Sequence, residues 1–311
     1  MYFTGKSKGV EYINYAKFKS DKLHNLSKYA KDTLRIKEDG IYKYGGIEHK
    51  KDYILPKNSE KLNLIKPFNT ELTLLELKKS YNLHNYYYHL NSSQMMAFNY
   101  FLPYTDNDFL KADFDKLSKV FSNLINREIS IKKLELEKES DLESVYLKNN
   151  EDKRLGGDTT FDVFFSCDNN TNISIEIKYT EYGFGKSKGS SNRHQLKFIQ
   201  CYEKCINENG IENYIDQKYL TVDFFLNNYQ LMRNLIHLYR KNQIIMFLYP
   251  KGNTKVDEEA KLIKDILINS NALDRLKIVY WEDLIEETIR IFEEDNALLS
   301  YYLEFENKYI L

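Results

Sequence analysis

Residues 159–181, with the sequence TTFDVFFSCDNNTNISIEIKYTE, contain two short segments rich in β-branched and aromatic residues. The stretch between them, residues 167–172, includes Asp-Asn-Asn, which is typical of a tight turn. In the second segment isoleucines alternate with Ser174, Glu176 and Lys178, as expected of a strand that buries one face. The stretch therefore predicts a β-hairpin, and its flanking segments decide what kind of sheet that hairpin joins.

Segments on both sides of the hairpin predict an α/β fold. Residues 113–126 have the apolar spacing of an amphipathic helix, residues 129–140 resemble a strand, and a charged loop is expected from there to about Gly157. The continuous apolar run at 243–250 is typical of a buried central strand. This order of elements predicts a central mixed sheet flanked by helices. Further elements are expected at residues 92–102, 190–206 and 223–241, as helices, and at 275–281, as a last strand.

The 311 residues are enough for one large domain or two modest ones, and the 42% apolar content is that of a folded globule. We expect a main domain over residues 91–311 and a basic N-terminal region over residues 1–90, where lysines and aromatic residues are interleaved. Residues 1–66 carry 15 Lys and Arg against 8 Asp and Glu, whereas residues 255–311 carry 7 against 14. The N-terminal region is therefore a possible DNA-contacting arm, or simply a solvated basic surface packed on the main domain.

The sequence predicts a cytoplasmic protein without a membrane partner. No apolar run approaches the roughly 20 residues that span a bilayer, and the first ten residues lack the apolar segment of a secretory signal. Three cysteines are too few for a disulfide framework. Cys201, Cys205 and His194 could belong to a zinc site, but structural zinc needs four ligands, so buried thiols are the ordinary interpretation.

The predicted hairpin brings three chemically useful side chains together. Asp162 lies on the strand face opposite its apolar neighbours, and strand pairing would place it beside Glu176 and Lys178. Two carboxylates can hold Mg²⁺, for which Mn²⁺ is expected to substitute, and the lysine can position or deprotonate a water or neutralise charge on a phosphate. An ordinary cross-strand ion pair would use the same residues, so the spacing alone leaves both interpretations open.

The wider pattern resembles a known nuclease superfamily. With carboxylates 14 positions apart across a hairpin, the chain resembles the PD-(D/E)XK nucleases, with Asp162 as the D and residues 176–178 as the (D/E)XK. Within that superfamily it resembles a bacterial family of predicted restriction endonucleases over about residues 90–250. The segments that carry this likeness are NSSQMMAFNYFLPY (91–104), TTFDVFF (159–165), EIKYTEYGFGKS (176–187) and QLMRNLIHLY (230–239).

The resemblance implies a fold and a set of roles. It implies a restriction-endonuclease-like αβββαβ core in which Asp162, Glu176 and the main-chain carbonyl of Ile177 bind the metal and Lys178 is the catalytic lysine. The chain departs from the superfamily motif at Phe161, where proline is usual; the carboxylate that follows is retained.

Four further residues have two interpretations each. Glu137 is a candidate upstream acid of the site or a solvated strand residue. Glu181 either supports the site from its edge or pairs with Lys178. Gln195 either bonds to that lysine or a phosphate, or is merely exposed. Arg233 either touches the DNA backbone or forms an ion pair between helices.

The loop GFGKSKGSSNRH, residues 183–194, is rich in glycine and cations. It does not match a nucleotide-binding Walker A loop, because Thr180 stands where that motif needs glycine. We expect Lys186, Lys188 and Arg193 to approach a phosphate backbone, with a flexible connecting loop as the alternative.

Together these features predict a Mg²⁺-dependent endodeoxyribonuclease of restriction type, a phage-defence enzyme that cuts double-stranded DNA. Cutting a symmetric site would need two active centres, so a homodimer is possible by analogy. The alternatives are a repair, mobile-element or RNA nuclease with the same core, a non-catalytic nucleic-acid-binding protein, and an unrelated α/β interaction protein.

Overall fold

The computed structural model describes residues 14–147, 155, 158–187 and 192–311. The chain forms two compact units. The first comprises Met1–Leu134, Tyr249–Thr254 and Val279–Leu311, and the second comprises Glu135–Leu248 and Lys255–Ile278. No boundary between them falls at residue 90, and the division expected there stays a prediction. None of the helices in these described ranges is long and apolar enough to cross a membrane.

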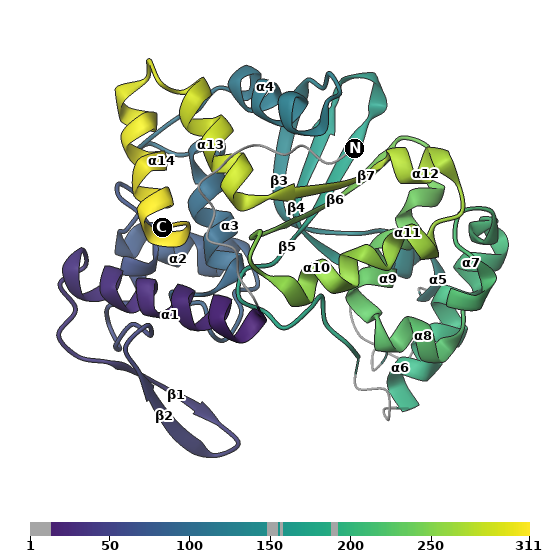
Figure 1. The fold of residues 1–311 in the computed structure, drawn as a ribbon, viewed down its shortest axis with the longest axis horizontal. Coiled ribbons are helices and arrows are strands. Elements are labelled where there is room, and N and C mark those ends of the chain that lie inside the picture. Colours follow the sequence, from purple (N-terminus) through teal and green to yellow (C-terminus); the bar gives the residue numbers. More distant parts are fainter. Residues whose placement is uncertain (1–13, 148–154, 156–157, 188–191) are drawn as a thin grey trace. The chain divides into compact units, whose positions relative to one another are not determined.

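The main sheet has five strands and is mixed, as the sequence predicts (Figure 1). Its order is β3-β4-β5-β6-β7, with β4 and β5 antiparallel and β5 and β6 parallel. All seven residues of β6 are buried, which confirms a central strand. The strands are β3 (Ile131–Glu139), β4 (Thr160–Cys167), β5 (Asn172–Ile177), β6 (Gln243–Tyr249) and β7 (Leu276–Tyr280).

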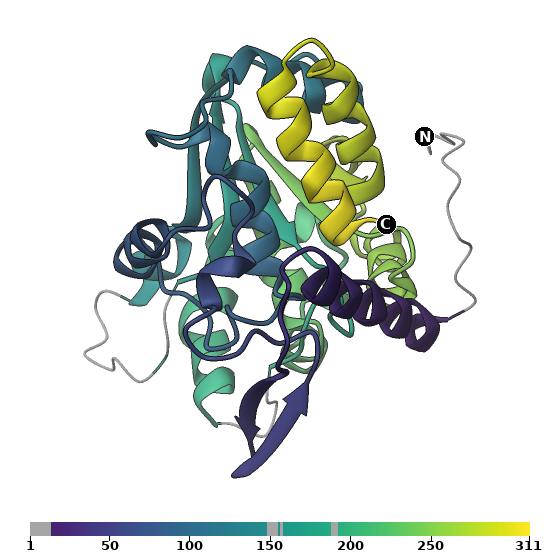
Figure 2. The ribbon, with the colours of Figure 1, turned by 90° about the vertical axis from the view of Figure 1, so that its left-hand side faces the viewer.

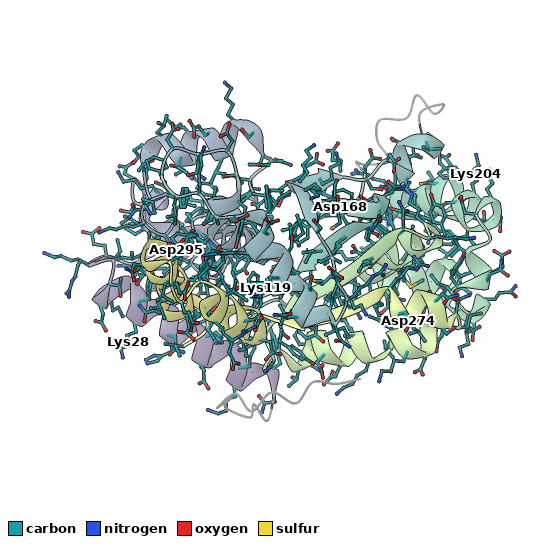
Figure 3. All side chains as sticks on the ribbon, turned by 90° about the horizontal axis from the view of Figure 1, so that it is seen from above. Lys28, Lys119, Asp168, Lys204, Asp274 and Asp295 are labelled. Atoms are coloured by element: carbon teal, nitrogen blue, oxygen red, sulfur yellow. The ribbon has the colours of Figure 1, made fainter. Side chains whose placement is uncertain are left out.

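The predicted hairpin is confirmed as β4 and β5. Val163 lies opposite Ile175, and buried and part-exposed residues alternate along the whole of β4. The turn contains a short 3₁₀ segment, Asp168–Asn170, in which Asn169 has the left-handed φ of 58° that asparagine tolerates. Asp168 at this turn is labelled in Figure 3. Because the strands are antiparallel and Val163 lies opposite Ile175, this register also places Asp162 beside Glu176.

Helices of the second unit flank the sheet and include two departures from the sequence prediction. The helix expected over 223–241 is interrupted at Asn228, whose side chain donates to the Phe224 carbonyl (3.0 Å) and whose backbone leaves the helical region. Part of the charged loop expected before Gly157 is helical, because Leu142 and Glu143 are buried. The helices are α5 (Leu142–Leu147), α6 (Asn192–Lys197), α7 (Glu203–Glu208), α8 (Val222–Asn227), α9 (Tyr229–Leu235), α10 (Thr254–Lys261), α11 (Ile263–Ile266) and α12 (Ser270–Asp274).

Shorter turns connect these helices. The helix expected over 190–206 is described from Asn192 and contains a wide π-type turn, Phe198–Tyr202, between α6 and α7. Helix α9 continues into a 3₁₀ turn, Ile236–Tyr239. Further 3₁₀ turns are Glu60–Asn63, Leu102–Tyr104, Ile211–Asn213 and Gln217–Tyr219.

The first unit is mainly helical, with a small hairpin of its own (Figure 2). Helix α14 packs on α1, α3 and α13, and α13 also packs on α4. Ser92 caps α3, since its Oγ accepts from the Met95 N–H at 3.3 Å. The elements are α1 (Tyr15–Asp32), β1 (Gly40–Tyr44), β2 (Ile47–Lys51), α2 (Glu71–Ser80), α3 (Ser93–Phe101), α4 (Phe114–Ile125), α13 (Trp281–Ile291) and α14 (Asn296–Tyr309).

An aromatic cluster forms the core of this first unit. The Tyr100 ring lies 5.7 Å from Trp281, 5.3 Å from Tyr302 and 5.6 Å from Phe305, measured between ring centroids. All four side chains are fully buried, and the Tyr100 hydroxyl bonds to Thr288 Oγ1 at 2.6 Å. Aromatic pairs of this kind stabilise a fold by about 0.5–1.5 kcal/mol each beyond their area burial.

Candidate functional site

Three predicted side chains converge on the β4–β5 hairpin. Asp162 projects from β4, and its Oδ2 accepts a hydrogen bond from the backbone N–H of Ile177 on β5 at 2.6 Å. Lys178, directly after β5, donates from Nζ to Glu176 Oε1 at 2.5 Å, and these two side chains are only 9% and 8% exposed. The hairpin therefore holds two carboxylates and one ammonium group together in a largely buried place.

The charges of these groups perturb one another. Burial and then the charge of Glu176 raise the pKa of Asp162 well above its ordinary value. Burial alone would lower the pKa of Lys178, but the charges of Glu176, Asp162 and Glu181 outweigh it and raise that pKa. Lys178 is therefore protonated at neutral pH, and its positive charge offsets part of the negative charge of the two carboxylates.

A fourth residue, which the sequence analysis missed, completes the contacts of Glu176. Asn234 on α9 is 1% exposed and donates from Nδ2 to Glu176 Oε2 at 3.1 Å and to the Gln230 carbonyl at 2.9 Å. Lys178 and Asn234 thus hold the two oxygens of the same carboxylate. Within the described ranges the buried Oδ1 of Asn234 has no hydrogen-bond partner. The only sequence signal was the position of Asn234 in the segment QLMRNLIHLY.

Two further acids add negative charge around this group. Glu137 on β3 is partly exposed, has a left-handed φ of 49°, and its charge contributes to raising the pKa of Asp162. Glu181 accepts from the backbone N–H of Tyr179 at 2.5 Å, and its charge contributes to raising the pKa of Lys178. Both acids therefore act electrostatically on the group.

The donor set suits a hard divalent cation. Carboxylate oxygens are the ligands that Mg²⁺ prefers, and a cation between Asp162 and Glu176 would relieve the repulsion that raises the Asp162 pKa. Among the described residues, no group of three or more His, Cys, Asp or Glu side chains is placed to hold a metal. Main-chain oxygen, with Ile177 as the expected donor, and water would have to supply the remaining ligands, and Mg²⁺ characteristically keeps several waters.

A second buried ion pair lies between α5 and α9. Glu143 is fully buried; its Oε1 lies 3.2 Å from Arg233 Nη2 and accepts from the Tyr202 hydroxyl at 2.9 Å and from Thr159. Burial alone would raise the pKa of Glu143, but the Arg233 charge and the Thr159 hydrogen bond lower it to about 2. The ion pair between helices considered for Arg233 is therefore present, and its contact with DNA stays a prediction.

The other predicted residues lie in or beside the loop after β5. Lys186, Arg193 and Gln195 are exposed, and Lys188 lies outside the described residues. Their contacts with phosphate or with Lys178 stay predictions.

The described start of this loop is held in place by backbone hydrogen bonds. The Phe184 N–H donates to Glu259 Oε2 at 2.6 Å, and the Ser187 N–H donates to the Leu226 carbonyl at 3.0 Å. Gly183 has a φ of 84°, and a Cβ there would lie 2.1 Å from Glu259 Oε1, so glycine is needed at this close approach. The cation at Lys186 is thus presented from an anchored segment.

The three cysteines are buried free thiols. Burial raises the pKa of both Cys201 and Cys205 to about 12, so neither is a reactive thiolate at neutral pH.

Comparison with known proteins identifies the family of the chain. No curated protein matches it, and no solved structure matches it. The model of one protein family, described as "Restriction Endonuclease associating with ARP", matches residues 22–310. Because this match covers nearly all of the 311 residues, the chain belongs to that family of restriction endonucleases.

Proposed function

We propose that this protein is a Mg²⁺-dependent endodeoxyribonuclease of restriction type with a PD-(D/E)XK active site. Membership in a restriction-endonuclease family implies a nuclease that hydrolyses DNA. The observation that carries the finer proposal is the convergence of Asp162 with the buried side chains of Glu176 and Lys178 on one hairpin. The element order α4, β3, α5, β4, β5, helices and β6 also supports an αβββαβ core of the kind found in that superfamily, with the short helix α5 inserted between the first two strands.

Asp162 and Glu176, with the main-chain carbonyl of Ile177, would hold the metal, which when bound would stabilise phosphate charge and acidify a water. Other groups of the chain orient these two carboxylates. The Ile177 N–H fixes the direction of the Asp162 carboxylate, and Asn234 fixes that of Glu176. Both carboxylates are therefore oriented before any ligand arrives.

The charge of Lys178 suits an electrostatic role. The neighbouring carboxylates raise its pKa, so Lys178 carries a proton at neutral pH in the metal-free protein. A buried ammonium group can donate a hydrogen bond to the attacking water or neutralise charge that develops on the phosphate. We therefore assign Lys178 an electrostatic role in the hydrolysis.

Contacts with substrate and a partner subunit complete the proposal. Lys186, Lys188 and Arg193 would bind DNA phosphates beside the site, since cations in a loop next to the hydrolytic group can hold the backbone in register. A homodimer would supply the two active centres that cutting both strands of a symmetric site requires. Defence against phage DNA is the biological role that such an activity would serve.

The test is cleavage by the purified protein of four substrates: supercoiled DNA free of base methylation, linear DNA, single-stranded DNA and RNA. Each is incubated with Mg²⁺, with Mn²⁺ and with a chelator. The proposal expects discrete fragments from duplex DNA with either cation and none with the chelator. Cleavage of RNA alone, or an unspecific smear of single strands, would move the assignment to the other nucleases with this core. Metal-independent cleavage would contradict the proposed site.

A further inference from the structure

The hairpin formed by β1 and β2 projects from the helices of the first unit (Figures 1 and 2). Its turn is Gly45-Gly46, with φ values of 59° and 81°, as in the type I′ turns that suit the twist of a two-stranded ribbon. A Cβ added at either glycine would meet nothing within 4 Å, so the turn stands in open space. Apart from Gly40, Tyr42 and His49, every residue of the two strands is exposed.

The base of this ribbon is fixed by tight packing. The Gly40 N–H donates to the Ile54 carbonyl at 2.9 Å, and a Cβ at Gly40 would lie only 2.5 Å from that oxygen. The Tyr42 ring stacks on His49 across the ribbon, with centroids 5.0 Å apart, and contacts Tyr86 and His89 at 6.0 and 5.2 Å. The ribbon is therefore anchored at its root and presents its outer half in a defined direction.

The outer half combines apolar side chains with cations. Tyr44 and Ile47, which face each other beside the turn, are 70% and 64% exposed. The lysines of the ribbon are Lys43, Lys50 and Lys51, and Glu48 is its single acid.

The one ion pair of the ribbon is weak. Lys43 Nζ lies 3.1 Å from Glu48 Oε1, but both side chains are more than half exposed. Exposed pairs of this kind stabilise a protein by only about 0–1 kcal/mol, so Lys43 can readily exchange its carboxylate for a phosphate.

We propose that the β1–β2 ribbon is a DNA-reading element that enters a groove of the duplex. Two-stranded ribbons fit the major groove of B-DNA, where side chains reach the base edges. Lys43, Lys50 and Lys51 bind phosphates, while Tyr44 and Ile47 lie against base edges or thymine methyl groups. The net positive charge of the ribbon favours this occupant over an uncharged protein surface. The inference rests on the proposed function only in taking duplex DNA as the ligand.

The experiment measures DNA binding without cleavage. Fluorescence anisotropy of a labelled duplex is recorded in EDTA over a series of salt concentrations. The charge variant is Lys43→Ala, Lys50→Ala, Lys51→Ala, and the tip variant is Tyr44→Ser, Ile47→Ser. A matched control replaces three exposed lysines elsewhere, Lys119 on α4, Lys204 on α7 and Lys241, by alanine; the first two are labelled in Figure 3.

The proposal expects distinct effects from the two ribbon variants. The charge variant lowers the slope of log K against log salt by up to about 2.7, because each lost phosphate contact accounts for about 0.9, whereas the control variant lowers it less. The tip variant keeps the slope of the wild type. Its affinity for the duplex that the wild type cuts is at least about tenfold lower.

Other outcomes overturn the proposal. If the wild type binds duplex DNA and both ribbon variants bind it with unchanged affinity and slope, the ribbon does not contact DNA. If both ribbon variants bind DNA as the wild type does but fail to bind a protein that the wild type binds, the ribbon is a protein-docking element. If the wild type binds no DNA, the ribbon proposal fails together with the DNA-nuclease assignment, whereas DNA binding by both ribbon variants with the affinity and salt slope of the wild type overturns the ribbon proposal alone.

Discussion

Asn234 Nδ2 lies 3.1 Å from Glu176 Oε2, on the oxygen of that carboxylate which Lys178 does not hold. The Glu176 carboxylate is therefore held by two donors: the ammonium group of Lys178, two residues further along the chain, and the buried side-chain amide of Asn234 on helix α9. Residues that orient a metal-binding carboxylate in this way set both its direction and its readiness to accept a cation. Asn234 is a positioning residue in this account, and its effect should be measurable separately from the chemistry.

We expect Asn234→Leu to weaken divalent-cation binding and to lower the cleavage rate, each by about 10–100-fold, because the Glu176 carboxylate loses its second donor. Mn²⁺ binding is measured by calorimetry without DNA, and cleavage is measured at saturating and limiting Mg²⁺. The control is Asn227→Leu on the exposed side of α8. Equal Mn²⁺ affinity for Asn234→Leu and the wild type would remove Asn234 from the site.

Asp162→Asn should make the metal-free protein more stable at neutral pH. The pKa of Asp162 is raised above 3.8 in the folded state, so its contribution to stability is present below pH 3.8 and is lost as the pH rises through the folded-state pKa. The asparagine variant does not undergo this loss. Urea unfolding in EDTA at pH 4 and pH 8 should therefore show a stability advantage of the variant that appears only at pH 8.

The turn residue of the same hairpin provides the control for this prediction. The comparison variant is Asp168→Asn, at an exposed position in the turn. Added Mn²⁺ should raise the melting temperature of the wild type more than that of Asp162→Asn. An equal rise for both proteins would mean that Asp162 does not help to bind the cation.

Glu143→Gln should change the acid sensitivity of the fold in the opposite sense. The pKa of Glu143 falls from 4.5 to about 2 on folding, so its stabilising contribution is present above pH 4.5 and is lost as the pH falls toward 2. A shift of this size corresponds to ~3 kcal/mol. The wild type should exceed the variant in unfolding free energy at pH 6, and the difference should shrink between pH 4.5 and 2. The control variant is Glu203→Gln, at an exposed position on α7.

The anchored root of the β1–β2 ribbon can be tested by its glycines. Gly40→Ala should lower the unfolding free energy by about 1–3 kcal/mol, because the added Cβ would lie 2.5 Å from the Ile54 carbonyl oxygen. Gly45→Asn at the open turn should be tolerated, since asparagine accepts the left-handed φ of 59°. Equal stability of the two variants would show that the root is not tightly packed.

The sequence predicts the parts of this fold that have strong periodicity. The β4–β5 hairpin, the buried strand β6 and the amphipathic helix α4 all follow from the spacing of apolar residues. The position of Asp162 beside Glu176 follows from the hairpin alone, since antiparallel pairing fixes which residues face each other. The proximity of the charged side chains on that hairpin can therefore be predicted from the sequence alone.

Other features depend on contacts that the sequence does not reveal. Glu143 looks like part of a charged loop, yet it is fully buried because Arg233, 90 residues away, neutralises it. Asn228 interrupts an otherwise regular helical pattern through a hydrogen bond from its side chain to the Phe224 carbonyl, one turn earlier. Asn234 has no distinguishing local signal, because an amide beside an arginine on a helix is usually exposed. Each case is a long-range or side-chain-to-backbone interaction that periodicity cannot report.

Hydrolysis at the β4–β5 hairpin is tested by single-turnover cleavage of duplex DNA with Mg²⁺ by Asp162→Asn and Lys178→Met. Asp168→Asn and Lys204→Met serve as matched controls, and DNA binding by every variant is measured in EDTA. The account predicts that the two site variants bind DNA but cut it at least about a hundredfold more slowly than the wild type, whereas the controls cut normally. Cleavage at the wild-type rate by both site variants would show that hydrolysis does not occur at the β4–β5 hairpin.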